Sequence, residues 1–162
     1  MNYRLLSSKD LSLFKKLRLE ALYNNPEYFA SSYSEEQIMP DDSFKLRLDN
    51  NFIFGFFVGD KLAGIVGYYK NKALKTKHKG IIWGLYLQKE YRSQGISSNL
   101  LNKLIEHARD NVSILHLTVN IENKAAVNLY EKFGFNIYGQ ENKSMYVNEK
   151  YIDEYLMYLD LN

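Results

Sequence analysis

The sequence predicts an α+β fold in which helices cover the faces of a central mixed sheet. The first observation is length, because 162 residues without repeats, low-complexity tracts or linker-like runs fit one domain over residues 1–162. The second is order: segments with strand and helix periodicity follow one another as one strand, two helices, three strands, a helix, a strand, a helix and two strands. This order is typical of a mixed sheet flanked by helices.

The N-terminal part begins with a predicted strand at Tyr3–Leu6 and a predicted helix from about Lys9 to Tyr23. The two serines before this helix can cap it. Its apolar residues recur at helical spacing, at Leu11, Phe14, Leu17 and Ala21. An Asn-Asn-Pro run ends it. Residues 27–37 are expected to be irregular, and residues 41–50 to form a short helix.

Strands and helices alternate in the rest of the chain. Residues 52–58 and 62–69 form a predicted hairpin through a Gly-Asp-Lys turn, and Gly80–Leu87 is the expected central strand. The next helix ends near Arg109 and has one apolar face, formed by Leu100, Leu101, Leu104, Ile105 and Ala108. The remaining elements are a strand, a helix and two strands, at residues 114–119, 123–133, 135–147 and 151–159.

The composition argues against several classes of function. There is no cysteine, which excludes disulfides, thiolate chemistry and cysteine-based zinc sites, and three scattered histidines predict no metal site. The net charge is +2, without the concentrated basic face of a nucleic-acid-binding domain. No N-terminal leader and no run of roughly 18 apolar residues is apparent. We therefore expect a cytoplasmic protein that binds neither nucleic acid nor membrane.

The stretch "EYRSQGISSNLL" (Glu90–Leu101) joins the central strand to the next helix. The first N–H groups of a helix lack internal partners and its dipole favours negative charge, so this junction can bind phosphate. Gly95 allows close backbone approach or a positive φ, and Ser97 and Ser98 add hydroxyl groups. The alternative is an ordinary helix start, in which Gly95 makes the turn and Ser97 caps the helix.

Two motifs resemble a known family. Arg92-Ser93-Gln94-Gly95-Ile96-Ser97 resembles the cofactor motif of the GNAT superfamily of N-acetyltransferases, although Ser97 stands where Gly or Ala is usual. Further on, "NIENKAAVNLYEKFGF" (Asn120–Phe135) resembles the family's next segment, with Asn123 and Tyr130 seven residues apart on one helix face. The resemblance covers roughly residue 52 to the C-terminus and is strongest to small bacterial members. It implies the acyl-CoA N-acyltransferase fold, with a twisted, mostly antiparallel sheet of about seven strands and about four helices.

The resemblance implies that acetyl-CoA is the cosubstrate and that no metal takes part. Backbone amides at the junction would bind its pyrophosphate, next to Arg92, at Ser93, Gln94, Gly95, Ile96, Ser97 and Ser98. The backbone of Leu85, Tyr86 and Leu87 would pair with the pantetheine arm like an added strand. The side chains of these three residues also suit core packing, which is compatible with that role.

The family's general acid corresponds to Tyr130, which would give its proton to the leaving thiolate. A phenol has an ordinary pKa near 10, so it is protonated at neutral pH. Packing on the helix face is the alternative role for Tyr130. Asn123 would contact and orient the cofactor arm or a water molecule, and it also suits the cap of the predicted helix.

No general base follows from the resemblance. The two positions where family members carry a base glutamate hold Thr118 and Ile81, and neither side chain can accept a proton from an amine. His116 lies two residues before Thr118 on the same strand face and could act through water, although an isolated strand histidine is more often structural. Further candidates are Glu35, Glu36 and Glu122. Our hypothesis is that no single side chain is an essential base.

The acceptor pocket of such proteins is framed by the first helices, the segment after them and the last hairpin. The candidate residues there are Phe29, Ser32, Tyr33, Glu35 and Tyr151. Acidic and aromatic side chains together suit a cationic amine, so we expect an N-acetyltransferase acting on a small-molecule amine. Acetylation of protein N-termini or lysines, and a non-catalytic acyl-CoA sensor, are the alternatives. The aromatic C-terminal strands are compatible with a homodimer.

Overall fold

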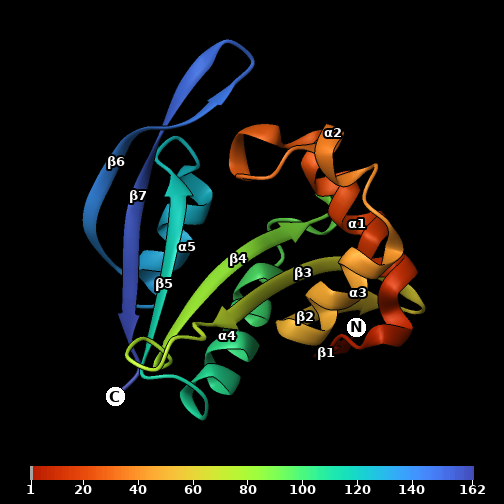
Figure 1. Ribbon diagram of the computed structural model, residues 1–162, viewed down its shortest axis with the longest axis horizontal. Helices are drawn as coiled ribbons and strands as arrows, with labels where there is room; N and C mark the ends of the chain where they lie inside the picture. The colour runs from red at the N-terminus through yellow and green to blue at the C-terminus, as the bar shows by residue number, and fades with distance from the viewer. Residues whose placement is uncertain (1) are drawn as a thin grey trace.

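The computed structural model describes residues 2–162 and has the predicted α+β architecture (Figure 1). Seven strands form one sheet in the order β1-β2-β3-β4-β5-β7-β6. All neighbouring strands are antiparallel except β4 and β5, which are parallel. The strands are β1 (Asn2–Leu5), β2 (Phe52–Val58), β3 (Lys61–Lys70), β4 (Lys79–Leu87), β5 (Ile114–Asn120), β6 (Asn136–Val147) and β7 (Lys150–Asp160).

Five α-helices accompany the sheet, one more than predicted. They are α1 (Leu11–Asn24), α2 (Tyr33–Glu36), α3 (Asp41–Asn50), α4 (Ile96–Arg109) and α5 (Lys124–Lys132). The additional helix, α2, lies in the segment that was expected to be irregular. Ser32 caps it by accepting a hydrogen bond from the backbone N–H of Glu35. A single turn of four residues carries too little periodicity to be seen in the sequence.

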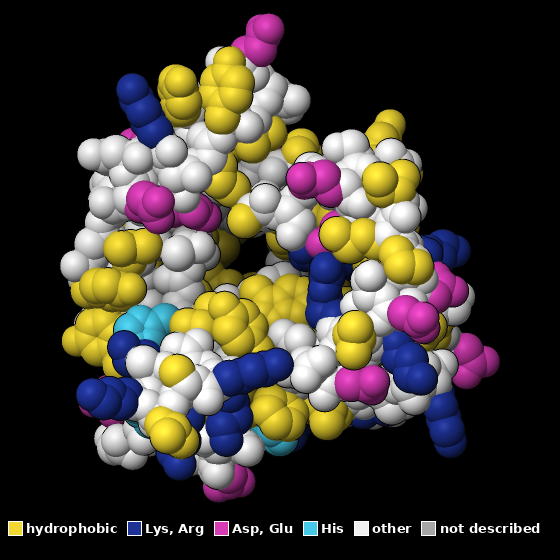
Figure 2. All heavy atoms as spheres, in the orientation of Figure 1, with side chains coloured by type: hydrophobic (Ala, Val, Ile, Leu, Met, Phe, Trp, Pro, Cys, Tyr) yellow, Lys and Arg dark blue, Asp and Glu magenta, His cyan; other side chains and the backbone are white. Residues whose placement is uncertain are grey.

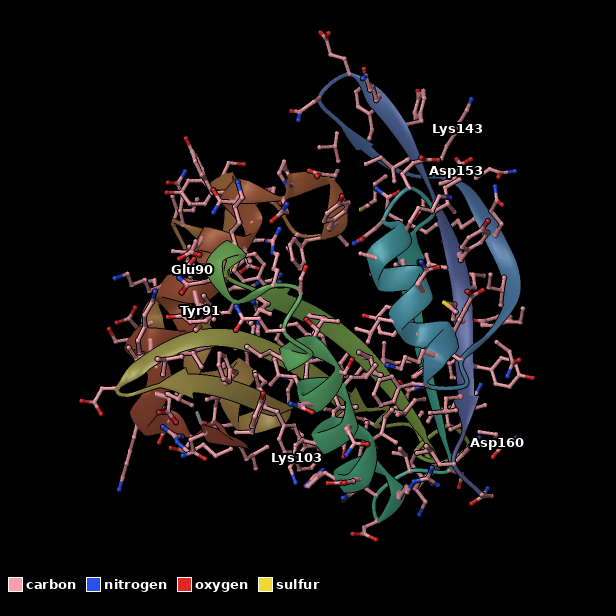
Figure 3. The ribbon with its side chains drawn as sticks, turned by 180° about the vertical axis from the view of Figure 1, so that it is seen from behind. Glu90, Tyr91, Lys103, Lys143, Asp153 and Asp160 are labelled. Atoms are coloured by element: carbon pink, nitrogen blue, oxygen red, sulfur yellow. The ribbon has the colours of Figure 1, made fainter. Side chains whose placement is uncertain are left out.

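Helices cover both faces of the sheet, and each face has its own apolar core. On one face, α1 and α3 pack against β2 and β3 through residues such as Phe14, Leu17 and Phe44. On the other face, α4 packs against β2, β3 and β4 through Leu100, Leu101 and Leu104. Figure 3, seen from behind, shows α4 over β3 and β4 and α5 beside β5 and β7. The apolar stripes predicted from helical spacing are therefore the buried faces.

Short turns fix the two hairpins. Gly59 and Asp60 connect β2 to β3, and Asn148 and Glu149 connect β6 to β7 with positive φ at both residues, as a type I′ hairpin turn requires. The β6–β7 hairpin extends beyond the other strands (Figure 1). Within this hairpin, Lys143 of β6 and Asp153 of β7 are neighbours (Figure 3), and the carboxylate of Asp153 accepts a hydrogen bond from the backbone N–H of Lys143. Within residues 2–162, no helix combines the length and apolar character that crossing a bilayer requires.

Candidate active site

The sheet opens between its two parallel strands. Strands β4 and β5 pair only at their start, where Lys79, Gly80 and Ile81 lie opposite Ile114, Leu115 and His116. Beyond Ile81 the two strands diverge (Figure 1). The edge of β4 that faces β5 therefore offers unpaired backbone N–H and C=O groups over residues 82–86, and such an edge can pair with an added extended chain.

A bulge in β4 accompanies this divergence. The pairing of β3 with β4 shifts register between Ile65 and Gly67, and Gly84 lies within the shifted part with φ +70°. A bulge bends its strand and increases the local twist. Positive φ is accessible to glycine at little cost, so Gly84 lets β4 turn away from β5.

A cavity of about 440 Å3 occupies the opening on the α4 and α5 side. We call it the α4–α5 cavity. It is lined by residues 82–87 of β4, the start of α4, residues 117–120 of β5, and one face of α5. Every predicted cofactor residue lines it except Gln94, whose side-chain amide donates a hydrogen bond to the backbone carbonyl of Glu90. Glu90 and the adjacent Tyr91 lie on the loop that enters α4 (Figure 3).

The start of α4 has the geometry that can hold an anion. The N-cap is Gly95 with φ +77°, and the first helical hydrogen bond runs from the N–H of Asn99 to the carbonyl of Gly95. The N–H groups of Ile96, Ser97 and Ser98 consequently lack helical partners, and these three residues line the α4–α5 cavity. Ser93 also has positive φ, at +61°. Alternating backbone handedness of this kind forms a nest of N–H groups. Ser97 is not the helix cap, so the ordinary-start alternative is wrong in this detail.

Tyr130 lies on α5 and faces the same cavity. It is 6% exposed and packs edge-on against Phe135, with ring centroids 5.6 Å apart. Its hydroxyl forms no hydrogen bond with any side chain or backbone group of residues 2–162. Burial raises the pKa of the phenol above its ordinary value, so the group keeps its proton at neutral pH. Asn123 caps α5 by accepting a hydrogen bond from the N–H of Ala126 (3.2 Å).

A second cavity of about 480 Å3 opens on the other face of the sheet, and we call it the α1–α3 cavity. Figure 2 shows the molecule hollowed between its two halves at this place. The two cavities meet at the opening between β4 and β5, because six residues line both: Tyr28, Phe29, Ile82, Trp83, Gly84 and Thr118. A molecule in one cavity can therefore reach a molecule in the other through the sheet.

Two arginines and a glutamate form a buried ion cluster beside the α1–α3 cavity. Arg18 of α1 donates to both carboxylate oxygens of Glu36, at 3.1 and 2.9 Å, and Arg47 of α3 donates to both at 3.0 Å. Burial pushes the pKa of Glu36 up, but the hydrogen bonds and charges of the two arginines outweigh it and hold that pKa below its usual value. Glu36 is therefore an ionised partner of arginine and is not available as a base.

The other predicted acceptor residues are dispersed. Phe29 lines both cavities, and Tyr151 lines a third cavity of about 470 Å3 next to the β6–β7 turn. The residues Ser32, Tyr33 and Glu35 surround the start of α2 and line none of these three cavities. The hydroxyl of Ser32 donates to the side chain of Glu35, and Tyr33 packs against Tyr23 with ring centroids 5.2 Å apart.

His116 also lies outside the three cavities. Its ring packs against Tyr138 and Tyr158, and its buried Nε2 has no hydrogen-bond partner within residues 2–162. Burial, followed by the nearby charges of Lys79 and His78, lowers the pKa of His116. The imidazole is therefore neutral at pH 7, and its surroundings are those of a packed side chain.

Sequence reasoning missed the three charged residues that line the α1–α3 cavity: Arg18, Arg47 and Glu154. A signal was present for each. Arg18 follows Phe14 by four residues, and Arg47 follows Phe44 by three, so both lie on the apolar face of their helix. Glu154 lies between Ile152 and Leu156 on one face of β7. A charged residue within a buried face is costly unless it has a partner or a function.

Comparison with known proteins decides the family. The model of the Acetyltransferase (GNAT) family matches residues 16–135 of this chain. The chain belongs to the GNAT family of acetyltransferases. The resemblance read from the two motifs is thereby confirmed, and so is acetyl-CoA as the cofactor of the family.

Proteins that are similar to this GNAT protein in sequence include two from bacteria. It is 33% identical over 78 residues to the L-amino acid N-acetyltransferase AaaT of Escherichia coli, a match that covers 46% of this chain and 48% of that protein. It is thus aligned with about half of that relative's length. It is 24% identical over 142 residues to the spermidine N(1)-acetyltransferase of Vibrio cholerae, covering 84% of this chain and 82% of that protein.

Two solved structures have the same fold as this chain. A GNAT acetyltransferase from Streptococcus pneumoniae superimposes with a TM-score of 0.86, 28% identity and 98% coverage of each chain. The yncA protein of Salmonella typhimurium, solved with its cofactor acetyl-CoA, has a TM-score of 0.87 at 14% identity, covering 100% of this chain and 94% of that one. At that identity the second match shows the fold alone. The predicted fold is confirmed.

Proposed function

We propose that this chain transfers the acetyl group of acetyl-CoA to the primary amine of a small molecule. One observation carries the proposal: two cavities, one suited to the cofactor and one open to an acceptor, meet at the opening between β4 and β5. The names of two relatives, an L-amino acid N-acetyltransferase and a spermidine N(1)-acetyltransferase, support a small amine as the acceptor.

The residues of the α4–α5 cavity fit acetyl-CoA. The free N–H groups of Ile96, Ser97 and Ser98, together with the helix dipole, suit the pyrophosphate. The edge of β4 at residues 85–87, which does not pair with β5, suits the amide groups of the pantetheine arm. Arg92 is held by its own hydrogen bond to the backbone carbonyl of Leu87 (3.0 Å), so it links the start of α4 to this edge.

Acetyl-CoA supplies an activated acetyl group: the amine nitrogen bonds to the thioester carbon, the carbon–sulfur bond breaks, and the sulfur leaves with its electron pair. The role that we assign to Tyr130 is to donate its proton to that sulfur. Burial favours the neutral phenol, so the proton is present when it is needed. The bound ammonium group loses one proton to water before it attacks, and the new amide nitrogen loses a second, which returns through water to the Tyr130 phenolate. No side chain is an essential base in this mechanism.

A thiol-release assay with acetyl-CoA against a panel of amines and peptides tests the proposal. We expect release with at least one small amine, and a fall in kcat of about a hundred- to ten-thousand-fold in Tyr130→Phe, the usual contribution of a positioned acid. The variant should melt no lower than wild type, because the hydroxyl has no protein partner to lose. It should also bind acetyl-CoA normally in calorimetric titration.

Three results would contradict parts of this scheme. Normal turnover in Tyr130→Phe would remove Tyr130 as the acid. Release with peptides alone would replace the small acceptor with a protein. Acetyl-CoA binding without release for any acceptor would make the protein an acyl-CoA sensor.

A further inference from the structure

The α1–α3 cavity has charged side chains of opposite sign on its two walls. Arg18 and Arg47 line it from the α1 and α3 side, and Glu154 lines it from β7. These are the three charged residues that line it within residues 2–162. Figure 2 shows Lys and Arg side chains reaching the rim of the hollow on the α1 and α3 side. The charges therefore sit on opposite walls of one cavity.

The arginine wall has an excess of one positive charge, because two guanidinium groups share the single carboxylate of Glu36. Their hydrogen-bonding capacity is not exhausted. Arg18 uses Nε and Nη2, and Arg47 uses Nη1, so Nη1 of Arg18 and the other two nitrogens of Arg47 have no partner within residues 2–162. The side chain of Arg18 is only 6% exposed. A guanidinium that is so buried and partly unpaired is suited to an anionic ligand group.

Arg18 lies close to the opening between β4 and β5, where acetyl transfer would take place. Its Nη1 lies 3.8 Å from the point where a Cβ on Gly84 would be. Gly84 lines both cavities at the opening between β4 and β5. An anionic group bound by Arg18 would therefore lie next to the passage through which the acceptor amine must reach the acetyl group.

Glu154 provides the negative wall. It is 8% exposed and accepts a hydrogen bond from the hydroxyl of Ser144, and none of the ion pairs formed within residues 2–162 includes it. Glu154 pairs in register with Asn120 of β5, two residues beyond Thr118, which lines both cavities. A buried carboxylate without a cation is suited to an ammonium group.

We propose that the α1–α3 cavity selects an amine that also carries a carboxylate, such as an amino acid, over a polyamine. The carboxylate would bind to Arg18 and Arg47, and the ammonium group would face Glu154 before it loses its proton. A polycation would place a second positive charge against the arginine wall. Aromatic residues of the same cavity, Tyr28, Phe29, Tyr69 and Trp83, suit an apolar side chain of the acceptor. This inference rests on the proposed function and specifies its acceptor.

Binding to the α1–α3 cavity can be measured without turnover. Trp83 is the single tryptophan of the chain and lines this cavity, so its fluorescence reports the occupant. With CoA bound, we would titrate L-leucine, L-leucinamide and spermidine, which differ in charge and lack competing fluorescence. We expect L-leucine to bind at least about ten-fold more tightly than L-leucinamide, which is the effect of one hydrogen bond to a charged group. Spermidine should bind more weakly still.

Variants of Arg47 test whether the arginine wall causes the preference for L-leucine over L-leucinamide. Arg47→Gln removes the excess charge and leaves the buried Arg18–Glu36 pair in place, so folding is preserved and the preference for L-leucine over L-leucinamide should disappear. Arg47→Lys keeps the positive charge and should therefore retain most of the preference for L-leucine. Glu154→Gln should weaken the binding of both ligands and leave their ratio unchanged. Circular dichroism would verify that each variant is folded.

The outcomes separate this inference from the proposed function. Equal or better binding of L-leucinamide or spermidine by the wild type would overturn the inference, and so would an unchanged preference in Arg47→Gln. If the same preparation releases thiol with amines, the proposed function would remain supported after either of these two results. Selective binding of L-leucine without any thiol release would instead overturn the proposed function and support the binding assignment.

Discussion

Ser97→Glu tests whether the start of α4 binds the pyrophosphate of acetyl-CoA. Ser97 is the second residue of α4, its N–H has no helical partner, and it lines the α4–α5 cavity. A glutamate there would put a carboxylate among the amides assigned to the pyrophosphate. The substitution brings a negative charge and added bulk to one point of the helix start.

The expected magnitude follows from the charge. Two like charges about 4 Å apart repel by about 4 kcal/mol at the effective dielectric of a protein surface. That energy corresponds to about a thousand-fold increase in the Kd for acetyl-CoA. The same carboxylate is favourable for the free protein, because a negative charge in the first turn of a helix contributes about 0.3–1 kcal/mol. Binding should therefore fall sharply while the melting temperature is maintained or rises.

Isothermal titration with acetyl-CoA, together with thermal denaturation of the free protein, measures both effects. Ser97→Gln is the matched control, because it has nearly the size of glutamate without the charge and should retain much more affinity. Ser97→Gly should stay within a few-fold of wild type. Normal affinity for acetyl-CoA in Ser97→Glu would show that the phosphate groups bind elsewhere. Equal losses of acetyl-CoA affinity in the Glu and Gln variants would show that the bulk of the side chain, rather than its charge, weakens binding.

Three further predictions concern the opening between β4 and β5, His116, and the ion pair between Arg4 and Asp10 near the N-terminus. Gly84→Ala should lower the free energy of unfolding by about 1–2 kcal/mol in urea titration, because φ is +70° and strain rather than a clash opposes the new Cβ. His116→Ala should leave kcat/KM within a few-fold of wild type and the pH–rate profile unchanged, since the ring lines none of the three cavities. Hydrogen bonding from Arg4 lowers the pKa of Asp10 from 3.8 to about 2. Its contribution to stability is thus complete above pH 4 and lost towards pH 2, and Asp10→Asn should flatten that loss in urea titrations across this range.

Most helices and strands could be predicted from local patterns in the sequence. Strand alternation, apolar helix faces and turn residues predicted all seven strands to within one or two residues at nearly every end, along with the two long helices α1 and α4. The exception was α2, a four-residue helix that depends on the cap at Ser32 and on the burial of Glu36. Such a helix is stabilised by its contacts rather than by its own periodicity.

The lining of the α4–α5 cavity was predictable for a related reason. Apart from residues 85–87 of β4, the predicted residues that line it lie in two continuous motifs, 92–98 and 123–130, and each motif is one end or one face of a single helix. Backbone N–H groups at a helix start are placed by local geometry. The acceptor side has no such continuity, and three of its five predicted residues line none of the cavities.

By itself, the sequence determined the order of elements, the family and most residues that line the α4–α5 cavity, because periodicity, capping and motif spacing are properties of neighbours in the chain. Only the tertiary structure decided that β4 leaves β5 after Ile81, and that Arg18, Arg47 and Glu154 share one cavity. These three residues come from α1, α3 and β7, and a charge cluster depends on distances in space. No spacing along the chain encodes such distances until the sheet and helices have packed.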